Sequence, residues 1–322
     1  MNARPTVACV GETMAMVTPT TRTPLTSSET FSVTPGGAES NVAAHLAARG
    51  FPTYWMSRLG DDALGDRIES VLSDRGIDLS KVVRDPAAHT GVYFKDPEPG
   101  QRSAVSYYRA GSAASRMSVA DADDWSLDRF AWLHTSGITA ALSTLCCELV
   151  EHLLSSARRF GYGTSFDVNY RPALISREEA ADRYLRLGRL STVVLVGLDE
   201  AQAIWQVETP EQVADLFPEV PYLVVKDGAR EAVEFSSGST AATAEPRTTV
   251  RIPARSVDVV EAVGAGDAFA AGYLCGLLEG ATSQQRLTSG HELAAWTLGS
   301  LYDFRPFPDV KIPPADQERT PR

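Results

Sequence analysis

Short apolar runs alternate with stretches of helical periodicity along most of the chain. The apolar runs predict strands over residues 6–10, 54–58, 130–134, 163–167, 193–196 and 222–225. The periodic stretches predict helices over residues 40–49, 63–75, 144–160, 177–186 and 211–217, and three of them are followed by Gly50, Gly76 and Gly161. Strands that alternate with helices form βαβ units. We therefore expect an α/β fold with a mostly parallel central sheet flanked by helices.

Two segments interrupt this alternation. Residues 12–35 are rich in Thr, Ser and Pro and show no helical period. Residues 90–95 and 103–109 read as two short strands, and the Asp-Pro-Glu-Pro-Gly sequence at 96–100 between them favours a turn, which predicts a β-hairpin. A hairpin inserted into an α/β domain is either a flap over a functional site or an ordinary surface insertion. The Pro-rich, charged tail from residue 306 is expected to be peripheral.

Composition narrows the class of protein. The chain has 322 residues, 43% of them apolar and 22% charged, as in a soluble globular protein, and no apolar run is long enough to span a membrane. A net charge of −11 disfavours nucleic-acid binding, so any anion must be held locally by arginines or helix N-termini. Four cysteines lie in apolar segments without a metal-binding spacing: Cys9, Cys146, Cys147 and Cys275. Together with the lack of a secretory signal, they indicate buried thiols in a cytoplasmic protein.

The strongest chemical motif is Gly-Ala-Gly-Asp at residues 264–267, which opens an apolar helix that runs to about residue 279. Small residues let a ligand approach the backbone, and the unpaired N–H groups of a helix start attract negative charge. Such a turn can cradle a phosphate, and Asp267 could accept a hydroxyl proton. The alternative is that Asp267 only caps the helix while the glycines allow tight packing.

A second motif lies near the N-terminus. Gly36 and Gly37 precede a helix whose first turn carries Asn41, an amide that can both donate and accept hydrogen bonds. The backbone of the paired glycines could expose N–H groups to a polyol. The alternative is a flexible turn in which Ser40 or Asn41 caps the helix.

Taken together, the two motifs resemble the signatures of the ribokinase-like (PfkB) carbohydrate kinases. These are Gly-Gly-x-x-x-Asn followed by an Ala/Leu-rich helix, and Gly-Ala-Gly-Asp-x-Phe-x-x-Gly. The resemblance covers roughly residues 6–305. It implies a single ribokinase-like domain over residues 1–322 with a small β lid formed by segments near 12–35 and 89–112. It further implies ATP and Mg²⁺ as cofactors, Asp267 as the catalytic base, and a phosphoryl cradle built by Gly264, Ala265 and Gly266.

Four further segments resemble those of the 2-keto-3-deoxygluconate kinases: residues 90–94, 105–115, 134–142 and 166–172. By that resemblance the sugar acid is contacted by Tyr93, Tyr107, Arg109 and Arg171, while Gly36, Gly37 and Asn41 hold its other hydroxyls. The chemistry is consistent with this, because arginine matches a carboxylate bidentately. Strand alternation places Tyr107 rather than Tyr108 on the side of Arg109. For both arginines, an ion-paired or solvated role is the alternative.

On the nucleotide side, residues 224–229 resemble the family's strand-to-loop element near the ATP phosphates. This implies that Lys226 and Gly228 bind ATP together with Gly264 and Gly266, although an ordinary strand end with a tight turn would look the same. Glu200 matches the family's Asn-x-x-Glu element, whose glutamate organises water around Mg²⁺, but Gly197 replaces the asparagine.

The sequence therefore favours an ATP-dependent kinase that phosphorylates a primary hydroxyl of 2-keto-3-deoxygluconate. A fructokinase- or ribokinase-type enzyme for neutral sugars and a non-catalytic sugar or nucleotide sensor remain alternatives. The expected partners are the small-molecule sugar acid and ATP, with no nucleic acid and no membrane, and exposed lid strands favour a homodimer or higher homo-oligomer. All of this requires the two glycine turns to face each other with Asp267 between them.

Overall fold

The computed structural model describes residues 4–21, 23–97, 104–237, 247–259, 263–300 and 303–305. The strands of its central sheet are β1 (Val7–Val10), β4 (Thr53–Met56), β9 (Trp132–Ser136), β10 (Gly163–Asp167), β11 (Val193–Gly197), β12 (Tyr222–Asp227), β13 (Glu231–Ser236) and β14 (Thr248–Pro253). The α-helices are α1 (Ala38–Ala48), α2 (Ala63–Asp74), α3 (Val119–Asp123), α4 (Gly137–Ala141), α5 (Thr144–Phe160), α6 (Arg177–Arg189), α7 (Leu198–Trp205), α8 (Pro210–Leu216), α9 (Ala265–Leu278) and α10 (Ser283–Leu298).

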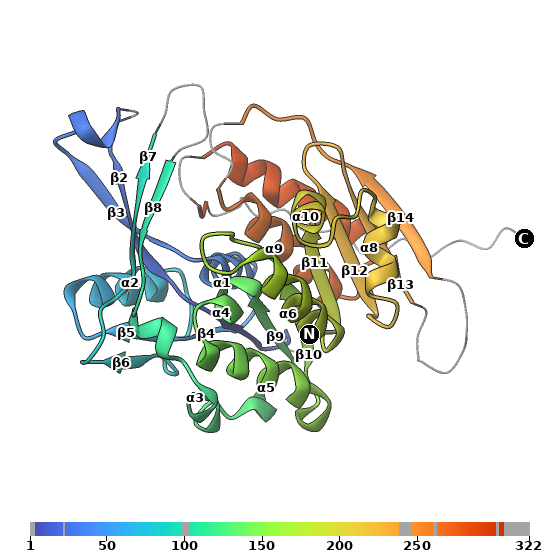
Figure 1. The fold of residues 1–322 in the computed structure, drawn as a ribbon, viewed down its shortest axis with the longest axis horizontal. Helices are drawn as coiled ribbons and strands as arrows, with labels where there is room; N and C mark the ends of the chain where they lie inside the picture. Colours follow the sequence, from blue (N-terminus) through green and yellow to red (C-terminus); the bar gives the residue numbers. More distant parts are fainter. Residues whose placement is uncertain are drawn as a thin grey trace, which may run out of the picture.

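The central sheet has the order β14-β13-β12-β11-β10-β9-β1-β4 (Figure 1). The six strands from β4 to β12 run parallel and are the six strands that the apolar runs predict. Their sequences are apolar throughout because helices cover both faces of a parallel sheet. In β11, Val193 and Leu195 join the core on one face, and Val194 and Val196 join the core on the other. The expected fold class is confirmed.

Helices cover the two faces in different groups. Helices α1, α2, α9 and α10 contribute to the core on one face, while α5, α6 and α7 contribute to the core on the other. The glycines that were expected to end three helices adopt left-handed backbone conformations, with φ of 80° at Gly50, 78° at Gly76 and 80° at Gly161. All five helices predicted from these periodic stretches are present, and their ends either match the prediction or shift by up to three residues.

A separate four-stranded sheet, called the small sheet below, stands beside the central one (Figure 1). Its order is β3 (Phe31–Gly36), β2 (Met14–Pro19), β7 (Val92–Asp96) and β8 (Ala104–Tyr108). Strands β7 and β8 are antiparallel, as the predicted hairpin requires, although residues 98–103 between them lie outside the described residues. Residues 12–35 contribute β2 and β3. Two short strands, β5 (Arg58–Gly60) and β6 (Val83–Asp85), form a third sheet.

Some elements were not expected from the sequence. Strands β13 and β14 extend the central sheet as antiparallel strands, and α7 and α10 form where no helix is predicted. Strand β14 alternates exposed and half-buried positions, as expected at a sheet edge that is covered on one side only. The four cysteines are free and buried, as predicted. The tail from residue 306 lies outside the described residues, and no described helix is both long and apolar enough to cross a bilayer.

Candidate active site

The two glycine turns meet where α1 and α9 begin. Helix α1 starts directly after Gly37, and α9 starts directly after Gly264. The Asn41 side chain of α1 donates a hydrogen bond from Nδ2 to Oδ2 of Asp267 in α9, with a distance of 2.9 Å. The arrangement on which the sequence interpretation depends, with Asp267 between the two turns, is therefore confirmed.

The start of α9 has the geometry of an anion site. Gly264 adopts φ +82°, and the first backbone bond of the helix runs from Ala268 N to the Gly264 carbonyl at 2.9 Å. The N–H groups of residues 265–267 precede that bond and have no acceptor within the helix. A Cβ placed on Gly266 would meet, among the described residues, only Lys226 Nζ at 3.8 Å. The space in front of this turn is therefore open and bordered by a positive charge, which suits a phosphate.

Asp267 has the acidity of a group that exchanges protons near neutral pH. Burial raises its pKa to about 7, the hydrogen bond from Asn41 lowers it, and the negative charge of Asp167 raises it. Near neutral pH the carboxyl can therefore both accept a proton and release it. This is the property expected of a general base.

Lys226, at the end of β12, is paired with Asp167, at the end of β10. The ammonium donates to Asp167 Oδ2 at 2.9 Å, and the two side chains are 18% and 3% exposed. Burial opposes the charge of Lys226, but the carboxylates of Asp167 and Glu200 outweigh it and raise the pKa of the ammonium. Lys226 therefore stays protonated beside Gly266, where the sequence interpretation places the ATP phosphates.

Glu200 lies in the first turn of α7. Its two carboxylate oxygens accept hydrogen bonds from the backbone N–H groups of Gly197 at 2.8 Å and Tyr170 at 3.1 Å. Burial raises the pKa of Glu200 to about 6. Gly197, which replaces the family's asparagine, has no room for a side chain in this arrangement, since a Cβ there would lie 2.5 Å from Asp199 Oδ1. Glu200 thus caps α7, and its contact with Mg²⁺-bound water stays a prediction.

Tyr93 connects the small sheet to the α9 turn through Asp303, a residue that the sequence did not point to. Its hydroxyl donates to Asp303 Oδ2 at 3.0 Å, and a Cβ on Gly36 would lie 2.1 Å from the same hydroxyl. The backbone of Asp303 covers Gly264, where a Cβ would be 2.5 Å from the Asp303 carbonyl oxygen. No motif near residue 303 signals this role, because the contact depends only on how the end of the chain folds back.

Arg109 and Tyr107 lie on the face of the small sheet that carries Tyr93. The rings of Tyr93 and Tyr107 are 5.7 Å apart, and the Arg109 guanidinium is 5.7 Å from the Tyr107 ring. Arg109 is buried and donates from Nε to Glu12 at 2.7 Å. Its charge is therefore balanced by the protein, as in the ion-paired alternative, although the pair is buried instead of at the surface. A direct contact with substrate stays a prediction.

Arg171 keeps more of its charge accessible. Its side chain is 45% exposed and lies 3.8 Å from Glu200, and its positive charge lowers the pKa of Asp267. Of the two arginines expected at the substrate, Arg171 is the one close enough to influence Asp267 and open enough to meet a ligand.

The remaining predicted glycines differ in their surroundings. A Cβ on Gly37 would lie 2.4 Å from the Glu12 carbonyl oxygen, so Gly36 and Gly37 pack against protein instead of facing open space. Gly228 adopts φ +49° in the turn between β12 and β13, with no described atom within 4 Å of a Cβ there. The turn needs a glycine for its backbone, which is the ordinary reading of that motif. Ligand contacts at these three positions stay predictions.

The site offers few direct ligands for a metal. Within the described ranges no three His, Cys, Asp or Glu side chains are grouped to hold an ion. Asp167 and Glu200 lie close to the phosphate space, and each carboxylate already accepts hydrogen bonds from protein groups. This donor set fits a magnesium ion held mainly by nucleotide oxygens and water, which is how Mg²⁺ is commonly bound beside phosphates.

Comparisons with known proteins agree with this geometry. Residues 4–309 match the model of the pfkB family carbohydrate kinases. The chain is 32% identical to the 2-dehydro-3-deoxygluconokinase of Bacillus subtilis (strain 168), over 88% of this chain and 87% of that protein. It is 31% identical to the enzyme of the same name from Thermoproteus tenax, over 95% of this chain and 92% of that protein.

Solved structures show the same fold. A PfkB protein from Polaromonas sp. JS666 superimposes with a TM-score of 0.83 at 32% identity, covering 93% of this chain and 97% of that one. The 2-dehydro-3-deoxygluconokinase of Thermotoga maritima gives a TM-score of 0.79 at 27% identity, with 94% and 96% covered. With the family match over nearly the whole chain and the two signature turns joined at Asp267, this protein belongs to the PfkB family of carbohydrate kinases.

Proposed function

We propose that the protein transfers the γ-phosphate of ATP to a primary hydroxyl of a 3-deoxy-2-keto sugar acid, with 2-dehydro-3-deoxygluconate as the substrate. The observation that carries the proposal is the position of Asp267: a carboxyl with a pKa of about 7, hydrogen-bonded to Asn41, at the start of a helix with free N–H groups. The names of the relatives from Bacillus subtilis and Thermoproteus tenax support the choice of sugar acid.

In the proposed reaction Asp267 accepts the proton of the sugar hydroxyl as the oxygen attacks the γ-phosphorus. The bond from that phosphorus to the β,γ-bridging oxygen breaks, and ADP leaves. Negative charge on the transferred group meets the N–H groups of residues 265–267 and the positive end of α9. The Lys226 ammonium borders the same space, 3.8 Å from a Cβ placed on Gly266.

A bound Mg²⁺ would supply charge neutralisation on the nucleotide phosphates. Glu200 would act on its water ligands, because its two carboxylate oxygens already accept hydrogen bonds from backbone N–H groups.

The carboxylate of a sugar acid needs a fixed positive charge in a protein with a net charge of −11. Arg171 meets this need, because its guanidinium is accessible and lies near Asp267. Tyr107 is 45% exposed on the face of the small sheet that carries Tyr93, so its hydroxyl can bond a sugar oxygen. A neutral sugar would not use the charge of Arg171.

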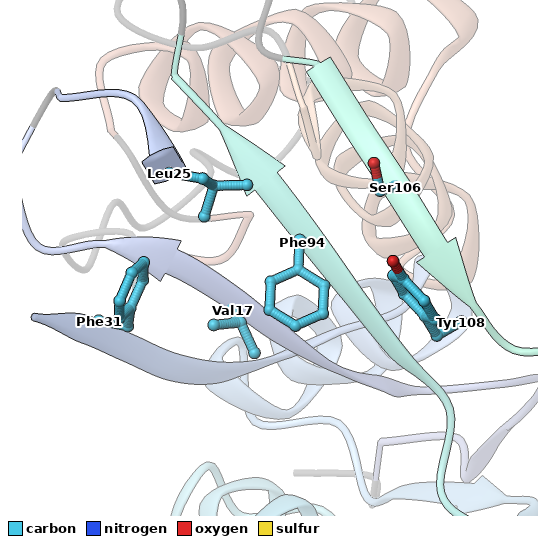
Figure 2. A pocket seen from close by; sticks show the side chains of 6 residues that line it. All are labelled: Val17, Leu25, Phe31, Phe94, Ser106 and Tyr108. Carbon is cyan, nitrogen blue, oxygen red and sulfur yellow. The ribbon is translucent and has the colours of Figure 1, made fainter. Parts of the chain in front are cut away.

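The small sheet is proposed to act as the lid of the site. Its inner face carries Tyr93 and Tyr107, and closure over the sugar would exclude water, which limits hydrolysis of ATP. Its outer face has a hollow of about 420 Å³ lined by uncharged residues (Figure 2): Val17, Leu25, Phe31, Phe94, Ser106 and Tyr108.

This outer face is also where we propose that two copies of the chain associate. Phe31 is 41% exposed and Tyr108 is 63% exposed there. Two copies with the same net charge of −11 repel one another, so they associate best through an uncharged apolar surface. Sedimentation of the wild type and of Tyr108→Lys would test it: a dimer that becomes a monomer supports the lid interface, and an unchanged mass contradicts it.

The function is tested by a coupled assay of ADP release over a panel of acceptors. The panel holds 2-dehydro-3-deoxygluconate, 2-dehydro-3-deoxygalactonate, fructose, ribose and adenosine. Turnover with the sugar acids and little with the neutral acceptors supports the proposal. Preference for fructose or ribose would assign a neutral-sugar kinase instead, and ATP binding without ADP release from any acceptor would indicate a sensor.

A further inference from the structure

Asp167 is a buried carboxylate for which the proposed reaction has no direct use. It ends β10, is 2% exposed, and accepts hydrogen bonds from the backbone N–H of Asn169 at 3.2 Å and from Lys226 Nζ at 2.9 Å. It is too well enclosed to be a base for a sugar hydroxyl. A buried negative charge beside a site for phosphates would also oppose binding unless something neutralises it.

Lys226 supplies that neutralisation and points toward the phosphate space. Its ammonium is the described atom nearest to the open side of Gly266, at 3.8 Å from a Cβ placed there. Lysine is a flexible point charge on a four-carbon stem, so its position has to be fixed by a partner. Asp167 holds it from the side of β10, across the neighbouring strand β11.

We propose that Asp167 is a positioning residue for phosphoryl transfer, which holds the Lys226 ammonium beside the Gly266 turn. The inference rests on the proposed function, since it takes Lys226 to act on the phosphates of ATP. Asp167 makes no contact with substrate in this account and acts through the lysine.

This role has a consequence that a structural role lacks. With Lys226 present, the loss of the Asp167 charge releases the ammonium and harms catalysis. With Lys226 replaced by methionine, Asp167 is an uncompensated negative charge that repels the phosphates, so its loss becomes beneficial. The effect of Asp167→Asn should therefore reverse its sign between the two backgrounds.

The test is a double-mutant cycle with Asp167→Asn, Lys226→Met and the double variant. The measured quantities are kcat/KM for ATP in the coupled assay and the dissociation constant of ATP from calorimetry without acceptor. We expect Asp167→Asn to lower kcat/KM by about 10- to 100-fold in the wild-type background, since small displacements of catalytic groups have effects of this size. In the Lys226→Met background it should raise kcat/KM and tighten ATP binding.

Asp121→Asn is the matched control. Asp121 is also a buried carboxylate, and it pairs with Arg58 at 2.8 Å away from the site, so this variant reports what the loss of a buried ion pair does to the fold alone. We expect it to lower the thermal unfolding temperature without changing KM for ATP.

A loss from Asp167→Asn in both backgrounds, or a loss no larger than that of Asp121→Asn, would overturn the inference. A failure of the proposed function would be seen in different measurements. The wild type would release no ADP, or Asp267→Asn would keep full turnover. The calorimetric cycle reports the coupling between Asp167 and Lys226 in either case.

Discussion

Asn41 and Asp267 are joined by a hydrogen bond of 2.9 Å although 226 positions separate them in the sequence. The bond unites the N-terminal and C-terminal signature turns, and it favours the ionised form of the carboxyl that lies between them. Several measurable properties of the protein depend on this contact and its surroundings.

Replacing Asp267 with asparagine should remove the base and keep the hydrogen bond from Asn41, because the new amide oxygen can accept it. We expect kcat to fall by at least about 100-fold, the usual contribution of a general base. The coupled ADP assay measures this. Turnover within a few-fold of the wild type would show that Asp267 is not the base.

The same variant should be more stable than the wild type at alkaline pH. The pKa of Asp267 is about 7 in the folded protein and 3.8 in its ordinary state, so ionisation opposes folding, and stability is lost as the pH rises through this window. Asparagine does not ionise. Thermal unfolding at pH 8 should therefore occur at a higher temperature in Asp267→Asn, and the difference should vanish near pH 4. A difference that does not depend on pH would contradict the assigned pKa.

Activity should rise with pH through about 7 as Asp267 ionises. Asn41→Ala removes the donor that lowers this pKa, so the acid limb of kcat/KM should move to higher pH. Ser40→Ala is the control, because the Ser40 hydroxyl donates to the Gly37 carbonyl within the same turn, at 3.1 Å. If both variants leave the limb in place, the hydrogen bond from Asn41 does not tune the base.

The two glycines of the α9 turn should respond differently to alanine. Gly266→Ala places its methyl group in open space 3.8 Å from Lys226 Nζ, so the fold should be unaffected while KM for ATP rises. Gly264→Ala combines φ +82° with a clash against the Asp303 backbone at 2.5 Å, so it should lower the unfolding temperature as well. Equal unfolding temperatures for the two variants would contradict this distinction.

Arg171→Met should reduce kcat/KM for a sugar acid much more than for a neutral sugar, because only the acid offers a carboxylate to the guanidinium. A loss of one bidentate, charge-assisted contact corresponds to about 10-fold or more. The acceptor panel measures both substrates with the same variant. Equal losses would count against the assignment of a sugar acid.

Unlike Arg171→Met, the variant Arg109→Met should mainly lower the stability of the fold. It leaves Glu12 buried without its partner, and such a change costs roughly 3–5 kcal/mol of folding free energy. We expect a large fall in stability, partly recovered by adding Glu12→Gln, as urea unfolding would show. A stable Arg109→Met that loses activity only with sugar acids would instead favour direct substrate contact.

The sequence predicts the central sheet well because its parallel strands are buried on both sides and read as plain apolar runs. It predicts less of the sheet edge, where β13 contains the buried Glu234 paired with Arg286, since a charged residue in a strand hides the apolar pattern. The two signature turns were recognised from their glycines, and their meeting at Asp267 is confirmed by the structure.

The parts of the site that sequence reasoning did not find depend on long-range pairing. Nothing in the local sequence of Arg109 reveals that Glu12 balances its charge, and Asp303 has no motif around it. Each contact joins segments that lie far apart in the chain, and pattern and spacing carry no information about which buried charges become partners.

The contact between Gly264 and the backbone of Asp303 has a consequence for the order in which the protein folds during synthesis. The first strand of the central sheet, β1, ends at Val10, and Asp303, which covers the phosphate turn, lies almost 300 positions later. All eight strands of the central sheet also precede Gly264 in the sequence, so a nascent chain on the ribosome can assemble this sheet before the phosphate turn is made. The covered turn can form only after residue 303 has been synthesised.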